Sequence, residues 1–318
     1  MGKRKRLCII SESDDEGGPA ESQGEQHMVE DVDNLNQAEC QSSDMQSLEI
    51  DCSNEEHSDQ GPLKKPRGPT QKPEIWSMKK STKIGVTFNS FGKPVGDEGN
   101  ELVQYLGTLV RMSQHVEIHY PDWRKVPLRK KEDMYLMVKE KFVFYPAETN
   151  LIKKWIIHSM GKKWRTWKGS LKARAYDSSC TIDEIVKNET MKDSRVNPVH
   201  FKDLVTRWFT PEFQTTCEKK RGSRSKMEEP HITGTKSFAR LAHEVEILNN
   251  GVSLTRGELY IKSRTRKNGN TTDDKAAEVV ASLKALPKDS TNTLSEKDDF
   301  SNDDYSKVKG PEKGDSFG

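Results

Sequence analysis

The stretch of sequence that decides the fold is Leu151–Tyr176, which reads LIKKWIIHSMGKKWRTWKGSLKARAY. In its second half, Trp164, Trp167 and Leu171 recur at the i, i+3 and i+7 spacing of one helix face. This spacing predicts a helix that packs two tryptophans into a core. Gly161 precedes them, and because glycine is a poor helix former, we expect it to divide the stretch into two helices.

Basic residues occupy another face of the same stretch, with the same i, i+3 and i+7 spacing. A basic ridge of this kind can run along phosphates or enter a major groove. The pattern leaves an alternative open, which is an ordinary amphipathic helix with a solvated Lys and Arg face. The residues of the ridge are Lys162, Arg165, Lys168 and Lys172.

Short alternating patterns predict a small amount of β-structure ahead of this stretch. In KIGVTFN, Ile84, Val86 and Phe88 alternate with the period of a half-buried strand. The sequence VEIHY repeats that alternation at residues 116–120, which predicts a second short strand. Apolar residues at helical spacing predict helices over residues 102–109 and 131–144.

Helix start signals dominate the second half of the chain. Asn197 is a good N-cap and Pro198 a good first helical residue, and Thr210 followed by proline repeats the signal. GTKSFARL predicts a helix after a glycine turn, which buries Phe238 and Leu241. The apolar stripe of the helix after Asn197 consists of Phe201, Leu204, Val205 and Trp208.

Two further helices are expected closer to the C-terminus. Thr255 and Glu258 have the spacing of a capping box, in which side chain and backbone cap each other. Thr272 is the expected cap of the last helix. The apolar side of that helix consists of Ala276, Val279, Val280, Leu283 and Leu286.

The charge of the chain is unevenly distributed. Residues 7–60 contain 16 Asp and Glu but no Lys or Arg, whereas residues 61–270 contain 41 Lys and Arg against 23 Asp and Glu. A basic body of this kind favours a polyanionic partner, although a solvated basic surface would have the same composition. Residues 11–60 contain no aromatic side chain, so we expect them to be disordered.

These signals predict a mainly α protein, a helical body with a minor short β element, flanked by long disordered N- and C-terminal segments. We expect an acidic disordered arm at residues 1–60 and a basic Pro/Gly linker at residues 61–82. A helical module with the Trp-rich basic helix would occupy residues 83–176. A second helical basic module would occupy residues 177–290, and a disordered tail residues 291–318.

Two other basic clusters are candidates for phosphate contacts. For the first cluster, the alternative is a frayed and solvated helix end. The first cluster consists of Lys219, Lys220, Arg221, Arg224 and Lys226, and the second of Lys262, Arg264, Arg266 and Lys267.

No catalytic constellation is recognisable, and the sequence implies no cofactor, metal or small-molecule ligand. TGTKSF lacks the glycine spacing of a P-loop, because the position five residues before Gly234 is Glu229. The closest histidine pairs, at residues 115/119 and 231/243, have no cysteine at ligand spacing. A metal-dependent nuclease needs converging carboxylates. The available ones are Asp122, Asp177, Asp183 and Glu189, and none follows an apolar strand.

Seven motifs suggest a family by their order along the chain. They are GKPVG, LGTLVR, YPDWRKVP, GKKWRTWKGSL, RSKMEEPHITGTKSFARL, TRGELYIKSRTRKNG and DKAAEVVASLK. Over residues 67–286 the chain closely resembles the plant transposase family of the Ptta/En/Spm type, associated with CACTA DNA transposons. The resemblance implies a transposon-derived plant nuclear protein. CACTA elements encode an accessory DNA-binding protein and a catalytic transposase as distinct products, and this chain resembles the former.

The leading hypothesis is therefore a non-catalytic protein that binds DNA through basic helices. The alternative is a protein-interaction module that recruits a transposase or chromatin partner. No apolar run approaches the ~18 residues that span a bilayer, so we expect no membrane association.

Two basic tetrads predict nuclear import, because they flank the acidic arm in sequence expected to be accessible. They are Lys3, Arg4, Lys5 and Arg6, and the cluster of Lys64, Lys65 and Arg67. Neutralising both should leave a fluorescent fusion in the cytoplasm, provided that the fusion is too large to diffuse through the nuclear pore. Unchanged nuclear accumulation of that fusion would refute the prediction.

Overall fold

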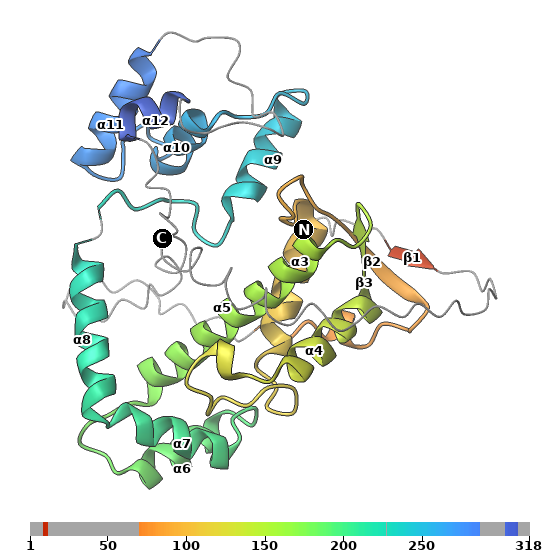
Figure 1. Cartoon of the computed structure of the whole chain (residues 1–318), viewed down its shortest axis with the longest axis vertical. Helices are drawn as coiled ribbons and strands as arrows, with labels where there is room; N and C mark the ends of the chain where they lie inside the picture. The colour runs from red at the N-terminus through yellow and green to blue at the C-terminus, as the bar shows by residue number, and fades with distance from the viewer. Residues whose placement is uncertain (1–8, 12–69, 227, 287–302, 311–318) are drawn as a thin grey trace, which may run out of the picture. The chain divides into compact units, whose positions relative to one another are not determined.

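The structure is a computed structural model that describes residues 9–11, 70–226, 228–286 and 303–310. In these residues the chain is mainly helical with one small sheet, so the expected fold class is confirmed (Figure 1). The chain divides into two compact units, Met1–Gly85 with Glu101–Glu218, and Val86–Asn100 with Lys219–Gly318. The expected acidic arm lies outside the described residues except at residues 9–11.

The first unit contains the sheet and most of the longer helices. Its strands are β1 (Ile9–Ser11), β2 (Thr82–Thr87) and β3 (Phe142–Tyr145), in the order β1-β2-β3. Its helices are α2 (Pro73–Trp76), α3 (Gly96–Leu109), η1 (Trp123–Lys125), α4 (Leu128–Lys141), α5 (Asn150–Ala175), α6 (Ile182–Lys192) and α7 (Pro198–Trp208). Both β2 and α3 cross the boundary between the units.

The expected strand at residues 84–88 is β2, in which Ile84 and Val86 are buried. It pairs antiparallel with β1, where Ile9 lies opposite Ile84. The second expected strand was wrong, because residues 116–120 form no strand. Val116 and Ile118 are nevertheless buried, so the alternation of apolar residues reflects burial and not strand pairing.

Helix α5 is one unbroken helix, so the expected division at Gly161 was also wrong. Gly161 is buried, and a Cβ atom there would lie 2.7 Å from Cδ1 of Trp123. The bare backbone therefore admits the Trp123 indole, whose centroid lies 5.7 Å from that of Trp164. The position of this glycine is explained by close packing between α5 and η1.

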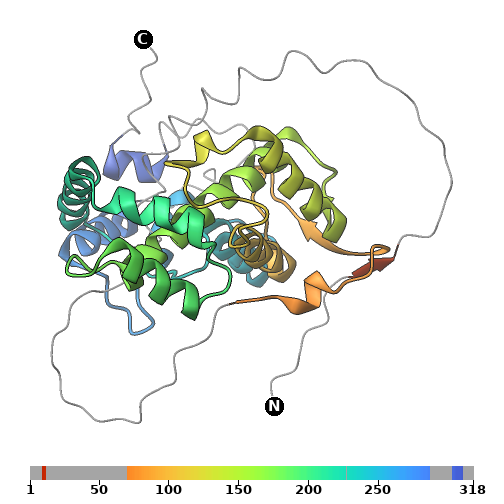
Figure 2. The same ribbon diagram turned by 90° about the horizontal axis from the view of Figure 1, so that it is seen from below.

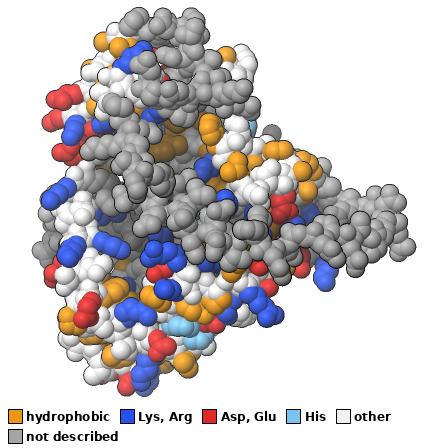
Figure 3. Space-filling view, in the orientation of Figure 1, with side chains coloured by type: hydrophobic (Ala, Val, Ile, Leu, Met, Phe, Trp, Pro, Cys, Tyr) orange, Lys and Arg blue, Asp and Glu red, His pale blue; other side chains and the backbone are white. Residues whose placement is uncertain are grey.

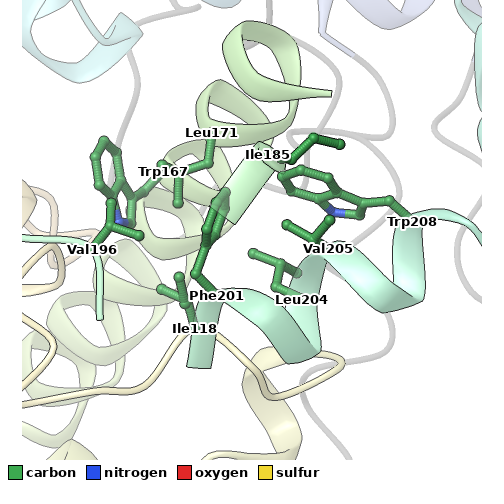
Figure 4. Packing of buried hydrophobic residues seen from close by; sticks show 9 residues of the cluster. All are labelled: Ile118, Trp167, Leu171, Ile185, Val196, Phe201, Leu204, Val205 and Trp208. Atoms are coloured by element: carbon green, nitrogen blue, oxygen red, sulfur yellow. The ribbon is translucent and has the colours of Figure 1, made fainter. Parts of the chain in front are cut away.

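The two tryptophans of α5 are in the core, as expected, with exposed fractions of 0% for Trp164 and 6% for Trp167. Figure 4 shows Trp167 and Leu171 of α5 facing the apolar side of α7, where Phe201, Leu204, Val205 and Trp208 form the expected stripe. Truncating such a buried tryptophan to alanine typically costs about 3–5 kcal/mol. That is a large share of the ~5–15 kcal/mol that stabilises a domain.

Helix α6 was missed by the sequence analysis, although its start carries a capping box. The Thr181 hydroxyl accepts from the Glu184 backbone N–H, and the Glu184 carboxylate accepts from Thr181. Helix α7 begins as expected, with the Asn197 side chain capping it and Pro198 in its first turn. Helices α6 and α7 lie side by side (Figures 1 and 2).

Two boundaries differ from expectation near α4. The helix expected over residues 131–144 begins earlier, at Leu128, and ends at Lys141. Phe142 and Phe144 belong instead to β3, where both are buried. The Phe142 ring lies 5.5 Å from the Tyr105 ring of α3, which explains why this aromatic run leaves the helix for a strand that covers a core.

The second unit contains the C-terminal helices α9 (Phe238–Leu248), α10 (Arg256–Arg264), α11 (Asp274–Ala285) and α12 (Asp304–Lys309), and α8 (Pro211–Ser225) enters it from the first unit. Tyr260 of α10 packs with Val280 and Leu283 of α11 and with residues of α12. The tail expected to be disordered from residue 291 thus contains a packed helix.

Helix caps in this unit follow expectation with one exception. The capping box of Thr255 and Glu258 is present at the start of α10. Helix α11 is capped by Asp273, whose carboxylate accepts from the Ala276 backbone N–H at 2.8 Å, and not by Thr272. Both residue types are good caps, and the chain uses the one nearer to the helix. Phe238 and Leu241 of α9 are half-buried rather than fully buried.

We predict that Gly161→Ala destabilises the first unit. Alanine favours a helix by about 1 kcal/mol over glycine, but overpacking against the Trp123 ring costs about 1–3 kcal/mol. The cost of overpacking should exceed the gain in helix propensity, so the free energy of unfolding should fall by up to roughly 2 kcal/mol in denaturant titrations.

Gly222→Ala in α8 is the matched control, because no atom lies within 4 Å of its Cβ position. This substitution should leave stability unchanged or raise it by up to about 1 kcal/mol. Equal effects of the two substitutions would contradict the proposed role of Gly161 in admitting Trp123.

Candidate nucleic-acid interface

The basic ridge of α5 is half-buried and engages other parts of the first unit. Lys168 Nζ donates to the Tyr120 carbonyl and lies 4.1 Å from the centroid of the Trp164 ring. Lys172 Nζ lies 3.2 Å from the Cys217 Sγ and 4.5 Å from the Phe213 ring centroid. These two cations therefore have roles inside the unit, and their expected phosphate contacts stay a prediction, as do those of Lys162 and Arg165.

The surroundings of Lys168 also disfavour its charged form. Burial, together with the Arg207 guanidinium, lowers its pKa to about 7, while Asp122 partly opposes the shift. Lys163 is similar, because burial and the neighbouring Arg111 lower its pKa to about 8. Two lysines of α5 are thus held close to other cations in a poorly solvated setting.

Helix α8 (Pro211–Ser225) has two dissimilar halves. Its first half packs on the first unit, where the Gln214 amide donates to the Tyr176 hydroxyl at 3.0 Å and Cys217 contacts Lys172. Phe213, Cys217 and Arg221 follow each other at i, i+4 and i+8, so one helix face passes from apolar to basic.

The second half of α8 displays the most exposed basic cluster of the sequence-based candidates. Figure 3 shows Lys and Arg side chains along this helix. Arg224 is half-buried. The other four are exposed and form no ion pair within the described part of the chain, and they are Lys219, Lys220, Arg221 and Lys226.

The candidate cluster at the end of α10 and in the turn after it contains both packed and exposed cations. Arg264 has a structural position, with its guanidinium 4.0 Å from the Tyr260 ring centroid and its Nε donating to the Glu229 carbonyl at 3.2 Å. Lys262, Arg266 and Lys267 are exposed. The backbone N–H of Arg266 donates to Asn270, which closes a turn with the last two cations near its tip.

Sequence reasoning missed an arginine cluster around Trp167. The guanidinium carbons of Arg174 and Arg195 each lie 4.9 Å from the Trp167 ring centroid, and that of Arg111 lies 5.8 Å away. Burial opposes ionisation of Asp193, but hydrogen bonds from Arg195 and Arg174 outweigh it and lower the pKa of Asp193 to about 2. Aromatic and acidic partners are both present, so this cluster joins α5 to the end of α6.

The carboxylates considered for catalysis each have a structural partner. Asp122 caps η1 through the Arg124 backbone N–H at 2.8 Å, and Asp177 accepts from Ser179. Asp183 pairs with Lys202 at 2.8 Å, and the buried Glu189 accepts from Arg174 Nε at 2.6 Å. In the described ranges, no group of three or more His, Cys, Asp or Glu side chains could hold a metal ion.

The histidines of the sequence-based pairs have separate neighbours. His115 stacks on Trp76 with centroids 6.5 Å apart, whereas His119 lies 5.2 Å from the ring of His200. His231 packs against Phe238, and His243 lies near Glu246. Lys236 of the TGTKSF stretch pairs with Glu244. The basic tetrads of the N-terminal arm lie outside the described residues.

Comparison with known protein families gives a match for the C-terminal part of the chain. Residues 197–318 match the plant transposase family (Ptta/En/Spm family). The match begins at the cap of α7 and covers α8 to α12, so it confirms the resemblance over the C-terminal part of the expected range. No curated protein and no solved structure matches the chain.

The transposase match extends past the motifs quoted from the sequence, whose last member ends in α11, and includes α12. This match identifies a transposase-family domain in the C-terminal part of the chain. None of the described helices is both long enough and apolar enough to cross a membrane.

Proposed function

We propose that this protein is a transposon-derived nuclear DNA-binding protein that contacts phosphates mainly through the second half of α8. In this proposal it has the accessory role found in CACTA elements and leaves catalysis to another protein. The observation that carries the proposal is the exposed run of Lys219, Lys220, Arg221 and Lys226, which form no ion pair within the described residues. The family match to residues 197–318 covers this helix.

The geometry of α8 suits a phosphate backbone. The helical residues 219–225 span roughly 10 Å, and Lys226 follows them directly. Duplex DNA carries one charge per ~1.7 Å of its axis. Four cations in that length therefore meet several phosphates at once, and each contact releases condensed counterions. Cations that have no internal ion pair break no such pair when they move to a phosphate. Lys262, at the end of α10, and Arg266 and Lys267, in the turn after it, meet the same condition.

A non-catalytic role is supported by the partners of the acidic side chains. Asp122, Asp177, Asp183 and Glu189 cap helices, close turns or form ion pairs. Moving any of them to a metal ion would break a local structural contact. The basic tetrads of the N-terminal arm are consistent with the proposed nuclear location.

A second candidate function is a protein-interaction module for a transposase or chromatin partner. The observation in its favour is an apolar patch at the end of α9, where Ile247 and Leu248 are 64% and 79% exposed and Val252, just beyond, is 58% exposed. Absence of any duplex binding by the full chain at low salt would favour this candidate over DNA binding.

We predict that replacing Lys219, Lys220, Arg221 and Lys226 with glutamine flattens the salt dependence of DNA binding. The slope of log affinity against log salt should fall by about 0.9 per lost phosphate contact, and so by roughly 3.6. Fluorescence anisotropy on a random-sequence duplex at several salt concentrations measures this slope.

A charge-matched control replaces four exposed lysines of the first unit instead, namely Lys125, Lys154, Lys187 and Lys192. This variant has the same net charge as the α8 variant, so it separates local contacts from the general field of the protein. The proposal expects a clearly smaller change in slope for the control. Equal slopes for the two variants would contradict the proposed phosphate contacts of α8, and the end of this helix would then be an ordinary solvated one.

A further inference from the structure

A pair of histidines lies outside the α8 surface, in the first unit. The rings of His119 and His200 lie 5.2 Å apart at an interplanar angle of 44°. Both Nδ1 atoms are buried and have no hydrogen-bond partner among the described residues. Buried polar atoms without partners cost about 1–3 kcal/mol each, and two such atoms side by side call for a shared ligand.

One cation contacts the segment that carries His119, and another lies on the helix that carries His200. Lys168 donates to the carbonyl of Tyr120, the residue next to His119, and Arg207 lies seven residues after His200 on the same face of α7. The Arg207 Nη1 is buried without a hydrogen-bond partner, and the guanidinium forms no ion pair with the described residues, although Asp203 lies one turn earlier. Lys168 and Arg207 are close enough for each charge to oppose the other.

Both acidic groups that interact with this cluster have a basic partner. Glu117, which interacts with His200, accepts from Lys130 through Oε1 at 2.7 Å, and its Oε2 is buried without a hydrogen-bond partner among the described residues. Asp122, which interacts with Lys168, is held by Arg124 at 3.3 Å. The cluster therefore keeps an excess of positive charge.

We propose that Lys168, Arg207, His119 and His200 form a phosphate-binding site. A phosphate group has the charge to relieve the repulsion between the two cations, and enough oxygens to accept from a guanidinium, an ammonium and two imidazoles together. All four residues are half-buried, so part of each side chain is exposed.

The phosphate can come from a DNA backbone or from a free phosphate compound, and two measurements on the full chain distinguish these sources. Inorganic phosphate is first titrated in thermal unfolding at constant ionic strength. A saturable rise of the melting temperature is expected, about 3–6 °C at ten times the dissociation constant. Arg207→Gln should weaken this response at least about tenfold, as should His119→Gln with His200→Gln.

Lys192→Gln is the control, because this exposed lysine of α6 lies outside the cluster, and it should respond like the wild type. Arg207→Lys keeps the charge and should partly restore the response. If phosphate raises the melting temperature without saturation, or equally in all variants, the effect is general salt stabilisation and the site does not exist.

Duplex DNA then identifies the source. A fall in the salt slope of about 0.9 in Arg207→Gln assigns the site to a backbone phosphate, and an unchanged slope assigns it to a free phosphate compound. Both results keep the site. The inference does not rest on α8, because the phosphate titration gives its answer even if the full chain binds no DNA.

Discussion

The first unit depends on the burial of one face of α5 along its whole length. Trp164 and Trp167 are inside the core only because the helix stays straight through Gly161, where the Trp123 indole lies against bare backbone. If α5 broke at that glycine, Trp167 and Leu171 would leave the apolar side of α7. The buried residues before Gly161, among them Ile152 and Ile156, and the tryptophans after it therefore lie on one continuous helix.

The same packing determines where the basic side chains of α5 lie. A helix surrounded by η1, α6 and α7 has little outer surface, so the residues next to its apolar face are drawn over aromatic rings. Lys168 covers Trp164, and Lys172 covers Phe213. No residue of α8 is buried, and beyond Glu218 its cations are exposed except for the half-buried Arg224. The difference between an internal and an external basic cluster thus follows from what surrounds each helix.

Periodicity and capping signals in the sequence predicted the helices whose apolar faces and ends are determined by residues close together in the chain. The stripe of α7, its Asn197 cap and the capping box of α10 were all readable from the sequence. Helix α6 carried an equal signal at Thr181 and was overlooked. Residues 116–120 were misread for a physical reason: alternating burial of Val116 and Ile118 results from contact with helices, and a strand also needs a pairing edge.

The sites were less predictable than the elements. Charge counting treats Lys172 and Lys219 alike, and only the packing distinguishes a lysine held near Cys217 from one in solvent. The juxtaposition of Lys168 with Arg207, and of His119 with His200, joins residues far apart in sequence. No spacing rule reports such pairs, because tertiary contacts between α5, α7 and the segment before η1 create them.

Lysine acetylation footprinting of the full chain, alone and bound to a duplex, tests the central claim most directly, because it reports contact at single side chains. If α8 meets the phosphates, acetylation of Lys219, Lys220 and Lys226 should slow on DNA binding. Acetylation of Lys187 and Lys192, exposed on α6, should not change. Unchanged acetylation of the α8 lysines in the saturated complex would contradict the account.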